Sequence, residues 1–320
     1  MPEPVITPLT QALAEGKLSR AELRALMARS DRPAAWRLGL WLLVLGATGT
    51  LVWASLGSPW QIPAMFVHGV VLVHHFSLQH ECVHYTVFRT RRLNDIIGNL
   101  CGAVIGLPHQ FFRYEHCDHH THTQISGDDP ELIALPRTIG GYLLYLSALP
   151  YWRAKLTEMA RHAAGRITPA EARFLPAPAR RAVIAEARAM LILYAALALA
   201  MLAFQWAAPL WFWLVPLILG EPVMRFIRMT EHVGRPTVAT MRVNTRTNLV
   251  SWPWRFLAWN MNYHAEHHYA ASVPFHALPR LHERLKDHIH VEHGGYLGAH
   301  RDILGQILGR KPRADAPAET

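Results

Sequence analysis

Residues 38–54 read LGLWLLVLGATGTLVWA, and after a break at Gly57-Ser58-Pro59 the apolar sequence resumes over residues 62–78 as IPAMFVHGVVLVHHFSL. No Asp, Glu, Lys or Arg occurs from Leu38 to Gln79. This stretch is longer than the roughly 20 residues that one helix needs to cross the hydrocarbon core of a membrane. Because a proline beside a turn residue ends one helix and begins the next, the sequence predicts two spanning helices joined as a hairpin.

A second apolar stretch repeats this pattern later in the chain. Residues 190–206 read MLILYAALALAMLAFQW, and after Ala207-Ala208-Pro209 the sequence continues over residues 210–220 as LWFWLVPLILG. It also lacks charged residues, from Ala189 to Gly220. The sequence therefore predicts an all-α integral membrane protein with four transmembrane helices in two hairpins.

Basic residues flank both hairpins and are absent from their turns. Because cytoplasmic segments of membrane proteins carry an excess of Lys and Arg, we expect both termini and residues 85–188 to lie in the cytoplasm. The chain has 32 Lys and Arg against 23 Asp and Glu, a net charge of +9. We interpret this excess as a topology signal, with membrane lipids as contacts, and we expect no nucleic-acid partner.

Histidine is the residue type that needs an explanation, since the chain has 21 of them. Eight form three clusters, with the sequences QHECVH, HCDHH and HAEHH. The members are His80 and His84; His116, His119 and His120; and His264, His267 and His268. Spacings of three and four residues lie on one face of a helix, so each cluster directs two or three imidazoles toward one point.

Metal binding explains these clusters better than a structural role at the membrane interface. A lone histidine there commonly caps a helix or contacts lipid, but three clusters exceed that role. Eight rings are too many for one tetrahedral metal ion, which takes three or four ligands. They suit two ions with about four imidazoles each. Imidazole binds Fe, Zn, Cu and Ni, so the ligand type alone names no metal.

The three histidine boxes and the paired hairpins resemble the membrane fatty acid desaturase / hydroxylase superfamily, from about Leu38 to Leu285. HECVHYTVF, the HHTHT run followed by GDDPE, and NMNYHAEHHYAASVPFHALPRLHE are similar to its bacterial desaturase-like branch. The resemblance implies two iron ions in a non-haem centre, O2 as co-substrate, and oxidation of an unactivated C–H bond in a lipid-like or hydrocarbon substrate. It also implies that the protein lies in the inner membrane of a bacterium.

The same resemblance adds a ninth metal ligand and no catalytic residue beyond the ligands. The family carries a histidine in the cytoplasmic segment after the last span, and His232 matches it. Imidazole ligands need a partner for their other ring nitrogen. We expect Asp118 and Asp129 to serve in this way, and Asn260 or Asn262 to hold a metal-bound water.

Other residues beside the boxes have more ordinary interpretations. We interpret Cys82 and Cys117 as small buried packing residues, because thiolate ligation would break the all-histidine pattern. The segment Asp128-Asp129-Pro130-Glu131 is also typical of a helix cap. Four later histidines are expected at the solvated surface: His288, His290, His293 and His300.

The chain divides into four parts on this interpretation. Residues 1–35 form an N-terminal cytoplasmic helical segment, in which Ser19 and Glu22 form a capping box. Residues 36–232 form the transmembrane domain, whose cytoplasmic insert 85–188 carries two histidine boxes. Within the insert, Thr168 begins a second capping box. Residues 233–310 form a C-terminal cytoplasmic cap with the third box, and the helical cap holds the metal site. Residues 311–320 form a disordered tail.

Desaturation of a fatty acid or acyl chain is the reaction that we expect first. The alternative is a hydroxylase or monooxygenase, or an oxidative decarboxylase, acting on a hydrocarbon, a lipid or a small metabolite on the same scaffold. A remote alternative is a membrane zinc hydrolase, whose ligands would normally include carboxylate or Cys.

The chain carries no flavin or nicotinamide fingerprint, haem segment or Cys cluster, yet each O2 needs two external electrons. We therefore expect a separate electron donor with its reductase: a ferredoxin, a Rieske-type protein or a cytochrome. Basic residues around the third box would attract an acidic donor. They are Arg242, Arg246, Arg255, Arg280, Arg284 and Lys286.

Overall fold

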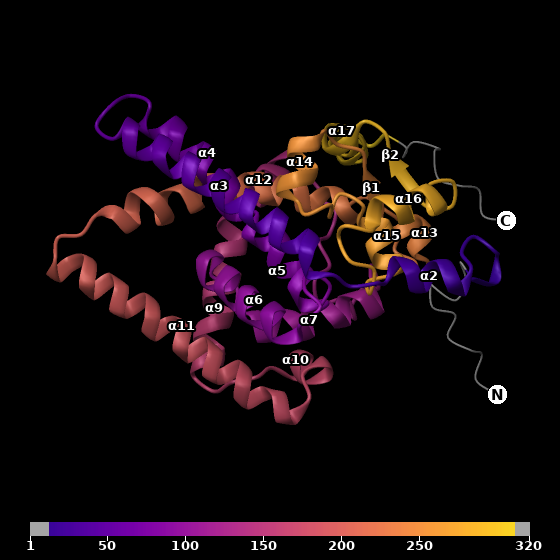
Figure 1. The fold of residues 1–320 in the computed structure, drawn as a ribbon, viewed down its shortest axis with the longest axis horizontal. Helices are drawn as coiled ribbons and strands as arrows, with labels where there is room; N and C mark the ends of the chain where they lie inside the picture. Colours follow the sequence, from indigo (N-terminus) through magenta and orange to yellow (C-terminus); the bar gives the residue numbers. More distant parts are fainter. Residues whose placement is uncertain (1–12, 311–320) are drawn as a thin grey trace.

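The computed structural model describes residues 13–310; the tail predicted to be disordered lies outside them. Within this range the chain is mostly helical, as the sequence predicts (Figure 1). The helices are α2 (Arg20–Leu26), α3 (Asp31–Ser55), α4 (Gln61–Val73), α5 (His75–Val83), α6 (Arg91–Ile105), α7 (His109–His122), α8 (Ile139–Leu146), α9 (Leu149–Ala163), α10 (Pro169–Phe174), α11 (Ala177–Ala203), the π-helical η1 (Leu210–Leu214), α12 (Val215–His232), α13 (Met241–Asn244), α14 (Trp252–Leu257), α15 (His264–Tyr269), α16 (Leu278–Leu285) and α17 (Gly295–Ile307).

Four segments are long and apolar enough to cross a membrane. They are Asp31–Ser55, Gln61–Val83, Ala177–Ala203 and Leu210–His232. The two predicted breaks fall between them, at residues 56–60 and 204–209. Large apolar side chains on these helices are exposed, for example Leu43 at 70% and Leu202 at 71%, as expected of surfaces that face lipid. Both turns lie on the side of the molecule away from α13–α17 (Figure 1).

α4 and α12 pack with their backbones in contact. A Cβ atom added to Gly69 would overlap the carbonyl group of Pro216, and one added to Gly220 would overlap the backbone of Gly69. Small residues at a helix crossing permit this close approach, which stabilises helix pairs in membranes. The contact therefore fixes α12 beside the segment that continues into the first histidine box.

Both predicted capping boxes are confirmed. At the start of α2, the Ser19 side chain accepts from the backbone N–H of Glu22, whose carboxylate accepts from the Ser19 N–H in return. Thr168 and Glu171 make the same exchange at the start of α10. These two reciprocal bonds satisfy N–H groups that the first helical turn leaves without a partner.

The part of the chain after α12 contains a β-structure that the all-helical prediction omits. Strands β1 (Arg246–Asn248) and β2 (His290–Glu292) pair in parallel, with Arg246 opposite His290. Arg246 is fully buried, and its guanidinium donates to Asp302 and to the carbonyl of Val233. Its assignment to a basic docking surface is therefore wrong, because this side chain holds β1 against α17 and the end of α12.

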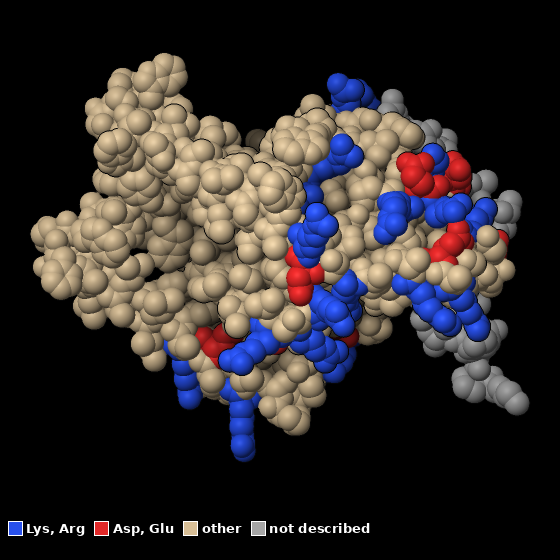
Figure 2. Space-filling model, in the orientation of Figure 1, with Lys and Arg blue, Asp and Glu red and all other residues tan. Residues whose placement is uncertain are grey.

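Charged side chains are unevenly distributed over the surface. Figure 2 shows Lys, Arg, Asp and Glu over the part that contains α2 and α13–α17 and along the edge below it, whereas the part formed by the two turns shows none. This separation is typical of a protein with one apolar, lipid-facing end and one polar end.

Candidate metal centre

Four segments bring nine histidines together at the ends of the spanning helices opposite the two turns. His80 lies in α5 with His84 directly after it; His116, His119 and His120 lie in α7; His232 ends α12; and His264, His267 and His268 lie in α15. Seven of the nine are buried, and His84 and His120 are half-buried. All nine predicted ligands therefore meet in one place, although they come from segments up to 188 residues apart in the sequence.

The nine imidazoles fall into two adjacent groups. His80, His84, His116, His120 and His267 form a group of five, and His119, His232, His264 and His268 form a group of four. Within each group the ring nitrogens that could bind a metal lie within 4.8 Å of one another. On α7, His120 belongs to the group of five and His119 to the group of four. This one helix therefore contributes to both candidate sites.

The Nε2 atoms of neighbouring histidines face one another inside the cluster, and their spacing fits metal coordination. The Nε2–Nε2 distances are 3.0 Å for His116–His120 and His232–His264, and 3.1 Å for His120–His267 and His264–His268. Two nitrogens about 2.1 Å from one ion lie about 3.0 Å apart at a right angle and about 3.4 Å apart at the tetrahedral angle. The observed distances are close to this range, so each pair of nitrogens lies near enough to bind one ion.

Several ring nitrogens of the cluster have no hydrogen-bond partner among the described residues. They include both nitrogens of His80, Nε2 of His84 and Nε2 of His119, all buried. A buried polar atom without a partner is unfavourable, and metal binding would satisfy each of these atoms. The donor set and its orphaned nitrogens therefore fit two metal ions.

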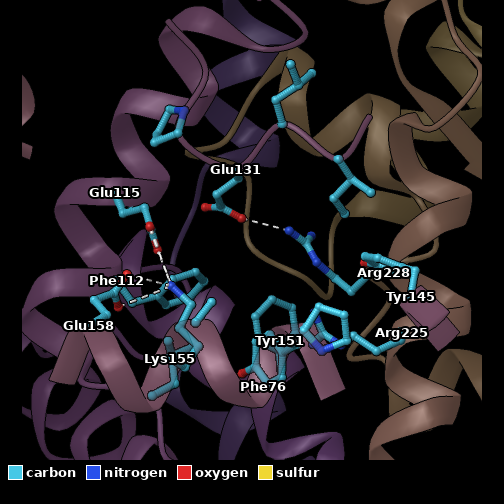
Figure 3. Close-up of a pocket in the computed structure, with 16 residues that line it drawn as sticks. Phe76, Phe112, Glu115, Glu131, Tyr145, Tyr151, Lys155, Glu158, Arg225 and Arg228 are labelled. Atoms are coloured by element: carbon cyan, nitrogen blue, oxygen red, sulfur yellow. Dashed lines mark hydrogen bonds and ion pairs between the residues drawn. The ribbon is translucent and has the colours of Figure 1, made fainter. Parts of the chain in front are cut away.

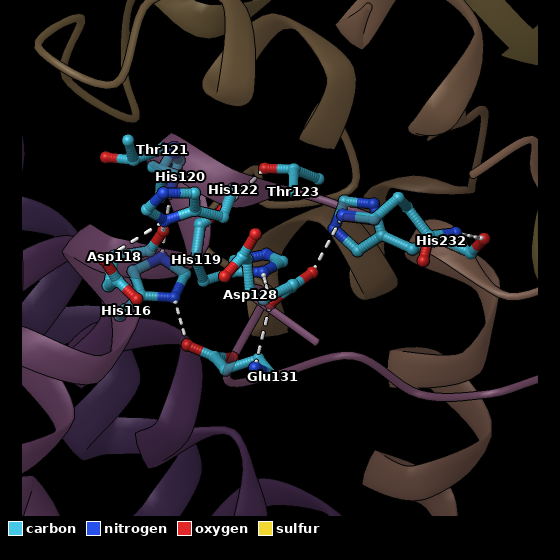
Figure 4. Close-up of polar contacts among 12 residues, drawn as sticks. His116, Asp118, His119, His120, Thr121, His122, Thr123, Asp128, Glu131 and His232 are labelled. Atoms are coloured by element: carbon cyan, nitrogen blue, oxygen red, sulfur yellow. Dashed lines mark hydrogen bonds and ion pairs between the residues drawn. The ribbon is translucent and has the colours of Figure 1, made fainter. Parts of the chain in front are cut away.

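Carboxylates contact the Nδ1 atoms of two histidines on α7. Asp129 Oδ1 lies 2.7 Å from Nδ1 of His119. Glu131 Oε1 lies 2.7 Å from Nδ1 of His116 (Figure 4). Such contacts fix the tautomer and the direction of an imidazole ligand. Hydroxyl and carbonyl groups take the same place elsewhere: Thr123 Oγ1 lies 3.1 Å from Nδ1 of His268.

Of the four residues expected to support the ligands, the structure brings Asp129 into contact with the cluster. Asp118 instead pairs with His122 and Arg173 at the rim of α7. Asn260 donates to the carbonyl of Phe275, and Asn262 donates to that of Asn248. These amides therefore stabilise the loop before α15.

Glu131 is the functional candidate that the sequence interpretation missed. Its position in GDDPE suggested a helix cap, but its carboxylate reaches both His116 and Arg228, at 2.7 Å each. Arg228 also pairs with Glu231. The one available signal was the position of Glu131 two residues after Asp129, which turns both carboxylates toward α7.

Burial keeps most of the cluster in the neutral form that binds metal. Burial, and after it the neighbouring imidazoles, holds the pKa of His116, His120, His264 and His268 well below the usual range. For His119 the carboxylates of Glu131 and Asp129 outweigh burial and raise the pKa. Neutral imidazole is the ligand form, so the site is suited to metal at neutral pH.

Four further expectations about single side chains are wrong. Cys117 is exposed on α7. His288 and His300 are buried: His288 bonds to the Tyr269 hydroxyl, and His300 bonds to the Tyr142 hydroxyl. His290 is also buried, in β2, whereas His293 is exposed as expected.

An apolar helical end joined to a two-group histidine cluster defines a membrane protein with a candidate two-metal centre. The chain belongs to the fatty acid desaturase family, because the model of that family matches residues 58–297. The match includes all nine clustered histidines. The resemblance that the histidine boxes suggested is thereby confirmed.

Curated relatives match the chain over shorter segments. Beta-carotene 4-ketolase 3 of Haematococcus lacustris is 34% identical over 94 residues, which are 28% of this chain and 29% of the ketolase. The sn-1 oleoyl-lipid 12-desaturase of Anabaena variabilis is 27% identical over 103 residues, which are 32% of this chain and 29% of the desaturase. Each match thus spans less than a third of the relative.

Proposed function

We propose that this chain is a membrane oxidoreductase that uses O2 to oxidise an unactivated C–H bond of a lipid-like substrate, with two iron ions held by the nine histidines. The division of these imidazoles into adjacent groups of five and four carries the proposal. We propose iron over zinc from the family match, because imidazole binds both metals. Fatty acyl desaturation is the reaction that we propose first, since the family model is that of the fatty acid desaturases.

The protein's own groups would hold the ligands and shape the space beside them. When bound, the iron ions would supply the activation of O2 and the removal of hydrogen from carbon. Asp129 and Glu131 orient two ligands on α7. The rings of Phe76 and Phe112 lie 6.0 Å from that of His80 and 5.2 Å from that of His116, and they would keep water away from this side.

Oxygen insertion is the second candidate, because relatives of two kinds match the chain. The Haematococcus proteins are named as carotene ketolases, whereas the Anabaena protein is named as a lipid desaturase. Both outcomes begin with removal of a hydrogen atom from carbon. The position of the substrate carbon decides between them.

The proposal includes an orientation in the membrane. The four apolar segments would form two hairpins whose uncharged turns, at residues 56–60 and 204–209, lie outside the cytoplasm. The histidine cluster and residues 233–310 would then form the cytoplasmic cap, in a bacterial inner membrane. An external electron donor would approach this cap.

Metal and product analysis together test the function. The purified chain should contain about two iron ions, and with a reducing system, O2 and candidate lipids it should yield a product. Mass spectrometry separates loss of two hydrogen atoms, the mark of desaturation, from gain of one oxygen atom. Zinc as the metal that supports turnover, or a hydrolysed product, would refute the proposal.

A further inference from the structure

A groove of about 510 Å³ lies between α9, α11, η1, α12 and the end of α6. Two of the four candidate membrane spans form two of its walls: α11, and the segment that joins η1 to α12. None of the described residues that line the groove is charged, and all of their side chains are apolar or aromatic. We refer to it below as the apolar groove.

The apolar groove opens on the surface that the spanning helices would present to lipid. Leu149, Leu156 and Ile218 line it and are still 66%, 57% and 62% exposed. Two charged side chains of α9, Lys155 and Glu158, face a separate cavity, where they pair at 3.2 Å (Figure 3). The groove is therefore suited to hydrocarbon from the surrounding membrane.

Two aromatic rings of the apolar groove are held in place through their polar atoms. The Tyr194 hydroxyl donates to the carbonyl of Ala103 at 2.8 Å, and Trp213 Nε1 donates to that of Val104 at 2.7 Å. Both carbonyls belong to the last turn of α6, where helix geometry leaves carbonyl groups without a partner. The two rings are thereby fixed before a ligand arrives, which lowers the entropy that binding costs.

One hydrophobic cluster joins the apolar groove to the histidines. Trp152 and Leu217 line the groove and also pack in the cluster that contains Phe76 and Phe112. The rings of these phenylalanines lie 6.0 Å and 5.2 Å from imidazoles of the group of five. Trp152 Nε1 is buried without a hydrogen-bond partner among the described residues. The layer between the groove and the histidines therefore includes an indole that no hydrogen bond holds.

We propose that the apolar groove binds a hydrocarbon chain of a membrane lipid, and that the chain to be oxidised leaves the bilayer here and passes Trp152 to reach the histidines. This inference rests on the proposed function, which makes a lipid-like molecule the substrate. The groove offers no charged partner to a head group, which stays outside it. Because lipid is as apolar as the groove, binding depends on close contact with the fixed rings rather than on removal from water.

Photolabelling without turnover tests the inference. The full chain, purified with its metal, is placed in lipid nanodiscs that contain a phosphatidylethanolamine with a diazirine near the end of one chain, and is irradiated without O2. We expect labelling of Ile218 in the groove to exceed that of Leu43, an exposed residue of α3, at least tenfold. Equal labelling would overturn the proposal, because the groove would then be ordinary lipid-facing surface. Stronger labelling of Ile218 by palmitate with the same diazirine, at equal concentration, would also overturn it, since the occupant would then be a free fatty acid.

Two tryptophan substitutions on α11 test whether the chain lies inside the groove. Ala198 lines the groove, whereas Ala196 is exposed on the same helix and does not line it. Ala198→Trp should fill the groove and reduce labelling of Ile218 at least tenfold, and Ala196→Trp should leave this labelling unchanged. Unchanged labelling in Ala198→Trp, or an equal loss in both variants, would overturn the proposal. Should Ala198→Trp not fold, Met201→Trp takes its place in the groove.

Kinetics separate a substrate site from a site that only holds lipid. Once a product has been identified, Ala198→Trp should raise KM for the lipid substrate at least tenfold and leave the iron content unchanged. An unchanged KM would overturn the assignment of the bound chain as substrate. Failure of the proposed function would show separately, as missing iron or missing oxidation, because the labelling is measured without turnover.

Discussion

Replacing Asp129 with Asn, with Asp118→Asn as a matched control, tests whether the cluster binds metal in the proposed way. The two carboxylates flank the same histidine box, but they differ in their contacts. Asp129 is buried and accepts from His119 Nδ1 at 2.7 Å, and from the backbone N–H groups of Gln124 at 2.8 Å and Glu131 at 2.9 Å. Asp118 contacts His122 and Arg173 near the surface.

The expected magnitude follows from these contacts. Loss of the Asp129 charge removes a charge-assisted bond to a ligand, and changes of this kind lower metal affinity about 10- to 100-fold. That range corresponds to about 1.4 to 2.7 kcal/mol of binding free energy. Asp118→Asn removes contacts near the surface, which are worth about 1 kcal/mol or less of unfolding free energy and nothing in metal affinity.

Competition with a graded series of iron chelators measures the affinity in detergent, and metal analysis after dialysis reports occupancy. Thermal unfolding of each variant without metal shows whether the fold is intact. Iron held by Asp129→Asn as firmly as by the unaltered chain would show that the contact with His119 does not support metal binding. An equal loss of iron from Asp118→Asn would refute the distinction between the two carboxylates.

Four further predictions concern the ligands, the membrane, the donor and the helix contact. His120→Ala or His268→Ala should abolish turnover and lower iron content while the protein stays in the membrane; full activity in either would refute the ligand assignment. Cysteines placed at residues 56–59 and 206–209 should react with a labelling reagent added outside the cytoplasm. Cysteines placed beside His80, His116, His232 and His264 should react with reagent on the cytoplasmic side. A histidine box labelled from outside the cytoplasm would exclude a shared metal site. Turnover with a soluble acidic electron donor should fall as the salt concentration rises, because exposed charges are screened beyond about 8–10 Å. The double variant Arg280→Glu, Arg284→Glu should reduce this turnover without loss of iron. Unchanged turnover of the double variant at low salt would exclude docking of the donor at these two residues. Gly220→Val should lower the unfolding temperature, because its side chain would overlap the backbone of Gly69, and an unchanged temperature would contradict the close packing.

The sequence predicts those parts of the fold that depend on local pattern. The breaks at Pro59 and Pro209, and the capping boxes at Ser19 and Thr168, follow from residues within a few positions of each other. The meeting of the histidines is also predicted, since their number and spacing have one economical explanation.

Long-range packing explains what the sequence could not predict. The burial of Arg246 depends on Asp302, 56 residues away, and the bond of His300 to Tyr142 spans 158 residues. The role of Glu131 depends on Arg228, which is 97 residues further along the chain. Nothing in the neighbouring sequence distinguishes these residues from surface charges or ordinary caps.

The glycine contact between α4 and α12 is the point about which the two spanning segments would rotate if their crossing angle changed. Gly69 lies 11 residues before His80 and Gly220 lies 12 residues before His232, so each ring is about 17 Å along the helical path from the pivot. A change of about 5° in the crossing angle would move the rings by about 1.5 Å relative to each other. The distance between the two histidine groups therefore depends on the angle at which α4 and α12 cross, which the glycine contact holds in place.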